Sequence, residues 1–150
     1  MRFRKQSANA EGASVGQNGA MSIHGIGTDI VSIERIRTAL SRREERFARF
    51  VLADSELARF EALSDKVAPA YVAKRFAVKE AFFKALGEPS STANTWHQLA
   101  VVNDEAGRPH LECGPLLAAL LDTKNISATH VTLSDEREHA VAFVVLEKET

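Results

Sequence analysis

The chain has 150 residues, of which 45% are hydrophobic and 26% charged, and this balance predicts a single domain with a substantial core. Its net charge of −1 argues against a general nucleic-acid binder. The one cysteine, Cys113, excludes an intrachain disulfide, and no apolar run of the sequence is long enough to span a membrane. These features are typical of a cytoplasmic enzyme.

Residues 1–21 differ in composition from the rest of the chain. They are rich in small and polar residues and contain almost no large apolar side chains. Such a segment cannot bury enough surface to fold alone, so we expect a disordered extension before a single domain over residues 22–150. Its basic start is not followed by the hydrophobic region of a signal peptide. Met21 is a candidate for the native start.

The spacing of apolar residues and the positions of capping and turn residues predict the remaining elements. In chain order they are a strand over 23–31, helices over 33–40, 41–50 and 54–63, a long helix over 67–86, strands over 99–102 and 108–112, a helix over 115–121, and a final hairpin of strands 126–133 and 140–146. The expected caps are Ser32, a capping box from Ser41 to Glu44, either Asp54 or Ser55, and Gly87. This order predicts an α+β fold whose mostly antiparallel sheet packs with one long buried helix and shorter helices.

The long helix is apolar on nearly every side, and such a helix is normally buried. It nevertheless carries Glu80 and Lys84, one turn apart on one face. A buried carboxylate needs a cation, a metal ion or a hydrogen-bond donor, because its burial otherwise costs several kcal/mol. We therefore expect Glu80 to have a functional partner. The simpler alternative is an ordinary ion pair between Glu80 and Lys84.

A second unexpected carboxylate, Asp29, interrupts the apolar run of the first strand, where aspartate is normally depleted. Together with Glu80 and nearby Lys and Arg residues it suggests a phosphate and Mg²⁺, which is usually held by one or two carboxylates plus substrate phosphates. A strand-end residue bonded to local backbone is the alternative. Gly25 and Gly27 lack the third glycine of a dinucleotide-binding pattern, and we expect them to permit close backbone approach beside Asp29.

Three motifs carry a family resemblance, which covers roughly residues 23–147. Gly-Ile-Gly-Thr-Asp-Ile-Val over 25–31, Arg-Phe-Ala-Val-Lys-Glu-Ala-Phe-Phe-Lys-Ala-Leu-Gly over 75–87, and His-Val-Thr-Leu-Ser-Asp over 130–135 resemble the signatures of holo-acyl-carrier-protein synthases. The resemblance implies a 4′-phosphopantetheinyl transferase fold. It also implies the reaction, in which the phosphopantetheine arm of coenzyme A moves to a serine of apo acyl carrier protein in fatty acid biosynthesis, releasing adenosine 3′,5′-bisphosphate.

The same resemblance assigns roles to particular residues. It implies that Asp29 and Glu80 hold Mg²⁺, that Lys84 contacts phosphate, and that His130 lies at the active site. Glu80 is the first candidate for the base that takes the serine proton, and His130 is the second. Arg75 and Lys79 would contact the phosphates of coenzyme A, although a solvated helix edge explains them equally well from the residues alone. A lone histidine is likewise more often structural than catalytic.

Two further features imply partners. Gly107-Arg108-Pro109 resembles a Gly-Lys-Pro turn that, in the family, reaches the nucleotide bound to a neighbouring subunit. The resemblance therefore implies a homotrimer with its sites at the subunit interfaces. The alternative for this segment is a simple β-turn. Arg35 matches a family position and belongs to an arginine-rich helical region suited to docking the acidic carrier protein. The alternative there is a solvated face with pairs such as Glu45–Arg49.

The chain departs from the family at Gly87-Glu88-Pro89, where many members have Gly-Thr-Gly, and at Asp135, where many have histidine. The proline and the added negative charge of Glu88 change the loop beside the expected phosphate site. They leave open a second hypothesis, a non-catalytic carrier-protein or nucleotide-binding module on the same scaffold. A different metal-dependent phosphotransferase is a third.

Overall fold

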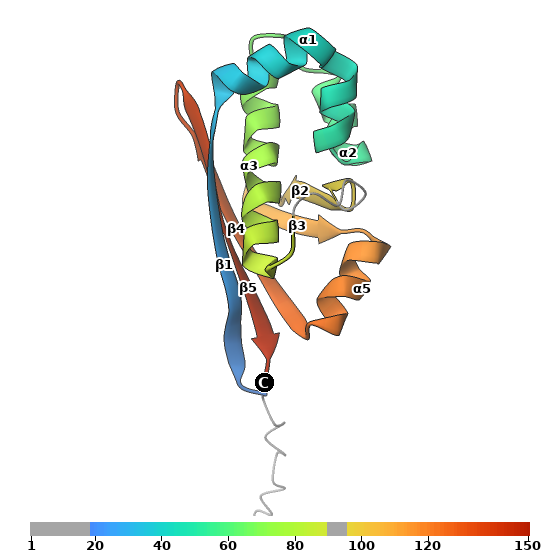
Figure 1. The fold of residues 1–150 in the computed structure, drawn as a ribbon, viewed down its shortest axis with the longest axis vertical. Coiled ribbons are helices and arrows are strands. Elements are labelled where there is room, and N and C mark those ends of the chain that lie inside the picture. Colours follow the sequence, from blue (N-terminus) through green and yellow to red (C-terminus); the bar gives the residue numbers. More distant parts are fainter. Residues whose placement is uncertain (1–18, 90–95) are drawn as a thin grey trace, which may run out of the picture.

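The computed structural model describes residues 19–89 and 96–150 (Figure 1). In chain order these residues form β1 (Met21–Ser32), α1 (Ile33–Val51), α2 (Asp54–Phe60), α3 (Ala68–Leu86), β2 (Leu99–Asn103), β3 (Pro109–Cys113), α5 (Pro115–Thr123), β4 (Ile126–Asp135) and β5 (His139–Glu149). The predicted α+β class and order of elements are confirmed. Residues 1–18 of the predicted extension lie outside the described part. No helix within 19–89 and 96–150 is long and apolar enough to cross a membrane.

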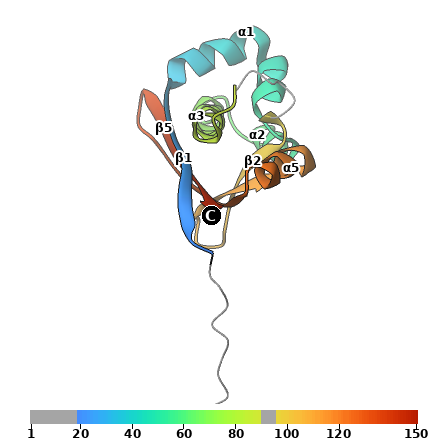
Figure 2. The same ribbon diagram turned by 60° about the horizontal axis from the view of Figure 1, so that its bottom comes forward.

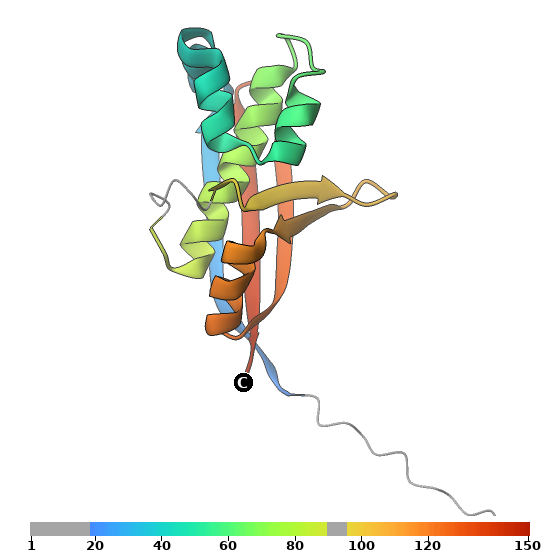
Figure 3. The same ribbon diagram turned by 90° about the vertical axis from the view of Figure 1, so that its right-hand side faces the viewer.

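The architecture is a three-stranded sheet with its helices on one face. The strand order is β1-β5-β4, all antiparallel, and β2 and β3 form a separate antiparallel pair. Figure 2 shows the described helices on one side of the larger sheet, with α3 surrounded by β1, β5, α1 and α2. In Figure 3 the β2–β3 hairpin runs across the long strands beside α3. This arrangement makes α3 the centre of the molecule.

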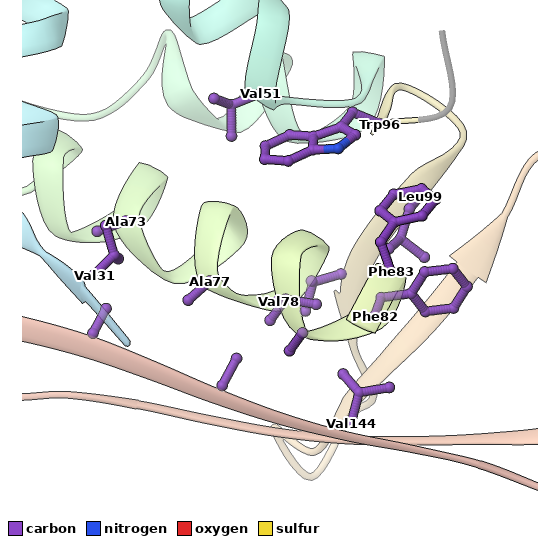
Figure 4. Close-up of a cluster of buried hydrophobic side chains, with 14 of the residues drawn as sticks. Val31, Val51, Ala73, Ala77, Val78, Phe82, Phe83, Trp96, Leu99 and Val144 are labelled. Carbon is purple, nitrogen blue, oxygen red and sulfur yellow. The ribbon is translucent and has the colours of Figure 1, made fainter. Parts of the chain in front are cut away.

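Helix α3 is buried as its all-round apolar sequence predicts. Its residues Val78, Phe82 and Phe83 are fully buried and project into the main core cluster (Figure 4). The rings of Phe82 and Phe83 meet edge to face at 5.4 Å between centroids. Trp96 closes the core beside α1, 2% exposed and 5.2 Å from the ring of Phe76.

Two glycines of β1 allow α3 to lie directly against the strand. A Cβ atom at Gly25 would lie 1.9 Å from the carbonyl oxygen of Ala85, and one at Gly27 would lie 1.8 Å from that of Ala81. Both contacts are with backbone, which cannot rotate away as a side chain can. The expected close backbone approach at these glycines is therefore confirmed.

The helix caps follow the predictions only in part. Ser32 caps α1 by accepting a bond from the Arg35 amide, and Gly87 ends α3 with φ 78°, as expected. The two pieces expected before Phe50 form one helix, kinked at Arg43, and Ser41 donates to the Thr38 carbonyl instead of capping a new helix.

The cap of α2 was predicted wrongly. Its N-cap is Ala53, and neither Asp54 nor Ser55 takes that position. The Ala53 amide donates to the Glu56 carboxylate at 2.9 Å, which is the half of a capping box that a glutamate at the third helical position supplies.

Candidate active site

An ion pair between β1 and α3 forms the first part of the site. The Lys84 ammonium donates to an Asp29 carboxylate oxygen and to the Thr28 carbonyl, each at 2.9 Å. The Asp29 side chain is 17% exposed and that of Lys84 is 52% exposed, so the pair lies at the surface, open to a ligand. The close approach at Gly27 brings the strand and the helix near enough for this contact.

Glu80 lies on the same flank of α3. It is half-buried and one turn before Lys84, so the two side chains share a helix face. Strand β1 runs antiparallel to α3, because Gly25 contacts Ala85 whereas Gly27 contacts Ala81. From Gly27 to Asp29 the strand advances by two residues, or about 6.6 Å. One turn of α3 back from Ala81 covers about 5.4 Å, which is slightly less. Asp29 therefore lies level with the helical turn that leads into Glu80.

The donor set of this flank suits a magnesium ion that a substrate helps to bind. Within the described residues, no group of three or more His, Cys, Asp or Glu side chains is placed to enclose a metal alone. Mg²⁺ needs no such group when one or two carboxylates are completed by phosphate oxygens and water. Asp29 and Glu80 are two hard oxygen donors on one open flank, and they fit this requirement.

A pocket of about 840 Å³ lies on the other flank of α3. It contains the predicted residues Arg75, Gly107 and Pro109. It also contains cationic and polar side chains that the sequence did not single out as site residues: Arg59, Lys74 and Asn103. Lys74 pairs at 3.0 Å with Asp135, which also lines the pocket, so the positive charge that suits an anionic ligand comes chiefly from Arg59 and Arg75.

Arg75 is held in this pocket by an aromatic ring. Its guanidinium carbon lies 3.9 Å from the centroid of the Tyr71 ring, within the range of a cation–π contact. The Tyr71 hydroxyl donates to the Glu56 carbonyl at 3.1 Å, and burial raises the pKa of this phenol. The Arg75 Nε is buried and has no hydrogen-bond partner within the described chain.

The turn between β2 and β3 has a defined shape. Gly107 has φ 82°, and the Asp104 carboxylate accepts bonds from the amides of Ala106 and Arg108, each at 2.9 Å. The bond from the Arg108 amide, followed by that from His110, holds the pKa of Asp104 below its ordinary value. Arg108 itself is exposed at the tip of the turn.

The two flanks are separate within one chain. Ala142 of the central strand β5 pairs with Asp29 of β1 on one side and with Leu133 of β4 on the other. Helix α3 covers the buried Ala142 between them. The Asp29–Lys84 pair lies on the β1 side, whereas Leu133 lines the pocket on the β4 side. The structure therefore brings the predicted residues together in two groups rather than one.

His130 belongs to neither group. It pairs with Val145, and β5 turns Val145 away from α3, so His130 lies on the outer face of the sheet. Its Nε2 atom is 2.8 Å from a Glu147 carboxylate oxygen. A single chain does not bring His130 to Asp29. The same outer face carries exposed large apolar side chains: Ile23, Ile26, Ile30, Val141 and Phe143.

Lys79 is buried rather than placed at the phosphate-binding helix edge that the family resemblance implies. It is 0% exposed, and its ammonium lies 2.7 Å from the carboxylate of Glu56, which is 2% exposed. It also donates to the Trp96 carbonyl at 3.2 Å. The expected contact between Lys79 and coenzyme A phosphate does not fit this position, because the ammonium is enclosed by protein. Glu56 was missed, although a glutamate three residues after a helix start is a sequence signal of a capping bond.

The arginine-rich helix and the Gly87-Glu88-Pro89 loop both carry ion pairs. Arg35 is exposed on α1, and the Glu45–Arg49 pair that the alternative of a solvated face predicted is present at 2.9 Å. The Glu88 carboxylate pairs with Lys124 at 2.7 Å, so the negative charge of the unusual loop is already matched by a cation.

Comparison with known proteins places this chain in a known class. Residues 25–144 match the profile of the 4′-phosphopantetheinyl transferase superfamily, and the chain belongs to that superfamily. It is 45% identical over 126 residues to the holo-[acyl-carrier-protein] synthase of Thiobacillus denitrificans, covering 84% of this chain and 95% of that one. It is 48% identical over 125 residues to that of Azoarcus sp., covering 83% and 98%. Within the superfamily it is thus a member of the holo-[acyl-carrier-protein] synthase family.

Solved structures agree with this assignment. The holo-[acyl-carrier-protein] synthase of Neisseria meningitidis superposes with a TM-score of 0.79 at 38% identity, covering 85% of this chain and all of that one. A holo-(acyl-carrier-protein) synthase from Bacillus anthracis, solved in complex with CoA (3′,5′-ADP), gives a TM-score of 0.71 at 32% identity, covering 87% and 100%. The resemblance carried by three sequence motifs is therefore confirmed over nearly the whole described chain.

Proposed function

We propose that this chain transfers 4′-phosphopantetheine from coenzyme A to a serine hydroxyl of apo acyl carrier protein. The products are holo acyl carrier protein and adenosine 3′,5′-bisphosphate. The observation that carries the proposal is the Asp29–Lys84 pair with Glu80 one turn away, in a chain that matches holo-[acyl-carrier-protein] synthases over most of its length. A relative solved with CoA supports the choice of donor.

Asp29 and Glu80 would hold a Mg²⁺ ion. When bound, the ion supplies positive charge that neutralises the pyrophosphate of coenzyme A. The Lys84 ammonium holds the Asp29 carboxylate in place and adds a second positive charge on the same flank. Fixed charges of this kind stabilise a phosphoryl-transfer transition state because they need not reorganise during the reaction.

Glu80 is the candidate general base. The serine oxygen of the carrier protein attacks the phosphorus atom bonded to the pantetheine arm, and its proton passes to the Glu80 carboxylate. The bond between that phosphorus and the bridging oxygen breaks, and the bridging oxygen leaves with adenosine 3′,5′-bisphosphate. His130 lies on the outer sheet face of its own chain, so it would serve this step only at the site of a neighbouring chain.

The complete site is formed between two chains of a homotrimer. Two features support this part of the proposal. The Asp29 flank and the Arg75 pocket lie on opposite sides of α3, and the outer sheet face that carries His130 exposes a cluster of large apolar side chains. Exposed apolar patches of this kind mark interaction sites. Arg75 and the Gly107-Arg108-Pro109 turn would then receive the nucleotide of coenzyme A bound at the Asp29 flank of the neighbour.

The carrier protein would dock on α1. Arg35 stands exposed beside further exposed arginines, and a strongly acidic partner would be oriented by their charge. Because such steering weakens with salt, the apparent affinity for the carrier protein is expected to fall as ionic strength rises.

The test is the intact mass of apo acyl carrier protein after incubation with this chain, coenzyme A and Mg²⁺. A gain of one phosphopantetheine that disappears with EDTA supports the transferase and its metal. Glu80→Gln should keep the fold and lose turnover by a factor of about 10²–10⁴, the usual contribution of a general base. A wild-type chain that is folded yet modifies none of several carrier proteins would instead favour the non-catalytic module.

A further inference from the structure

We propose that the buried Glu56–Lys79 pair is a positioning device that fixes the walls of the Arg75 pocket for coenzyme A. This inference rests on the proposed function and adds two residues that do not themselves touch the reacting atoms. Glu56 forms part of the pocket wall, whereas Lys79 lies behind it and is fully enclosed.

Lys79 connects α3 to three other segments. Its ammonium bonds to the Val51 carbonyl at the end of α1, to the Glu56 carboxylate of α2, and to the Trp96 carbonyl before β2. An ammonium has three N–H donors, and each of them has a partner here. The lysine therefore fixes where α1, α2 and the approach to β2 stand relative to α3.

Glu56 continues these connections into the pocket wall. One carboxylate oxygen accepts from the Val101 amide of β2 at 2.9 Å, and the other accepts from the Ala53 amide at 2.9 Å and from Lys79 at 2.7 Å. Val101 lines the pocket, and β2 continues into the turn that contains Gly107. The position of that turn is thus linked to α3 through a single carboxylate.

A second branch reaches Arg75. The Glu56 carbonyl accepts the Tyr71 hydroxyl bond at 3.1 Å, and the Tyr71 ring lies beneath the Arg75 guanidinium at 3.9 Å. Tyr71 and Arg75 both line the pocket. Glu56 therefore bonds directly to the hairpin wall and is linked through Tyr71 to the cation of the same pocket.

The attraction between the two charges does not by itself explain this arrangement. Charges taken out of water lose their hydration, and well-packed apolar residues of similar size often replace a buried ion pair without loss of stability. An apolar pair, however, could not bond the amides of Ala53 and Val101 or the carbonyl of Trp96. What the ion pair provides in addition is a set of directional bonds that fix four segments around one pocket.

The test compares coenzyme A binding with folding. In the double variant Glu56→Leu with Lys79→Met the pair is replaced by apolar side chains. We expect its KM for coenzyme A to rise about tenfold or more, since small misplacements of binding groups have effects of this size. Its kcat should stay within about twofold, because Asp29, Glu80 and Lys84 lie on the other flank. The matched control is Leu117→Ala, which removes a buried side chain of α5 outside the pocket lining.

The outcomes separate positioning from stability. If Leu117→Ala lowers the melting temperature as much or more while its KM for coenzyme A stays at the wild-type value, the rise in the double variant is due to positioning. A folded double variant with the wild-type KM overturns the proposal. If the double variant does not fold, Glu56→Gln decides, since its single carbonyl oxygen cannot accept all three bonds from Lys79, Ala53 and Val101, and its KM should rise several-fold. A folded Glu56→Gln chain with the wild-type KM overturns the proposal.

Failure of the proposed function is recognised separately. Calorimetric titration of each variant with coenzyme A measures the pocket whether or not phosphopantetheine is transferred. A wild-type chain that binds coenzyme A but transfers no phosphopantetheine would refute the proposed transferase activity. The role of the Glu56–Lys79 pair would still be tested by comparing the coenzyme A affinity of the double variant with that of Leu117→Ala.

Discussion

A methyl group at Gly27 should separate β1 from α3. In Gly27→Ala the new Cβ would lie 1.8 Å from the Ala81 carbonyl oxygen, whereas ordinary contacts begin at 3.4 Å, so the two backbones must move apart by about 1.6 Å. Overpacking of a core costs about 1–3 kcal/mol, and the upper end applies because both partners are backbone. For a chain of this size, about 3 kcal/mol lowers Tm by roughly 6–12 °C.

The same displacement should reduce activity beyond the loss of stability. Asp29 lies two residues after Gly27, and Glu80 directly precedes Ala81 in α3, so the two carboxylates would move apart. A misplacement of about 1 Å can cost about 10²-fold in rate. Thermal unfolding and carrier-protein modification at a temperature where the variant is folded measure the two effects. Gly19→Ala is the control, because nothing lies within 4 Å of its added Cβ. A Gly27→Ala chain as stable and active as Gly19→Ala would refute the close packing described for this strand.

Three other predictions concern single side chains. The Arg108 amide and His110 hold the pKa of Asp104 below 3.8, so its stabilisation of the turn is fully present above that value and is lost as pH falls through the lower folded pKa. Wild type should therefore be more stable than Asp104→Asn at neutral pH and lose that advantage in acid, which acid unfolding of both proteins would check. Burial raises the pKa of Cys113 from 9.0 to about 11, so iodoacetamide should label it about a hundredfold more slowly at pH 8 than an unperturbed thiol. Ile30→Glu on the outer sheet face should leave the chain folded but monomeric in sedimentation experiments, and a trimeric variant would argue against this face as the interface.

Local sequence patterns predicted most of the fold. The all-round apolar character of α3 reflects its burial, which side-chain spacing reports directly. The isoleucines that marked β1 lie instead on its exposed outer face: Ile23, Ile26 and Ile30. Gly25 and Gly27 were correctly interpreted because a glycine pair in an apolar strand has few other uses. The cap of α2 was missed because Ala53 has no polar side chain, and its amide is bonded by Glu56.

The apolar pattern of α3 does not specify which of its charged residues is fully buried. The sequence indicates that a helix apolar on all sides must bury some charge, and Glu80 was expected to be that charge because a carboxylate is costly to bury. The fully buried charge is Lys79, one residue earlier, whereas Glu80 is half-buried. Adjacent helix positions point about 100° apart, so the choice depends on which side faces α1 and α2. Lys79 finds its partner Glu56 at a separation of 23 residues, which no local pattern specifies.

The separation of the two flanks gives the sharpest test of a site shared between chains. Asp29→Asn should disable one flank and Arg75→Ala the other, so each variant alone should be poorly active. The Arg75→Ala chain still has an unaltered Asp29 flank, and the Asp29→Asn chain still has an unaltered pocket. In a cyclic oligomer assembled from an equal mixture of the two, some sites combine these two unaltered halves and are intact. About a quarter of the sites should then be intact, because each flank is drawn independently from the two variants.

Unfolding and refolding the two variants together should therefore restore activity to about a quarter of the wild-type level. Refolding each variant separately and mixing afterwards is the control, since subunits that do not exchange cannot form mixed sites. Activity that never exceeds the sum of the two separate variants would show that both flanks serve the same chain. In that case α3 could not separate the two groups during catalysis, and coenzyme A would have to reach around the helix from the pocket to Asp29.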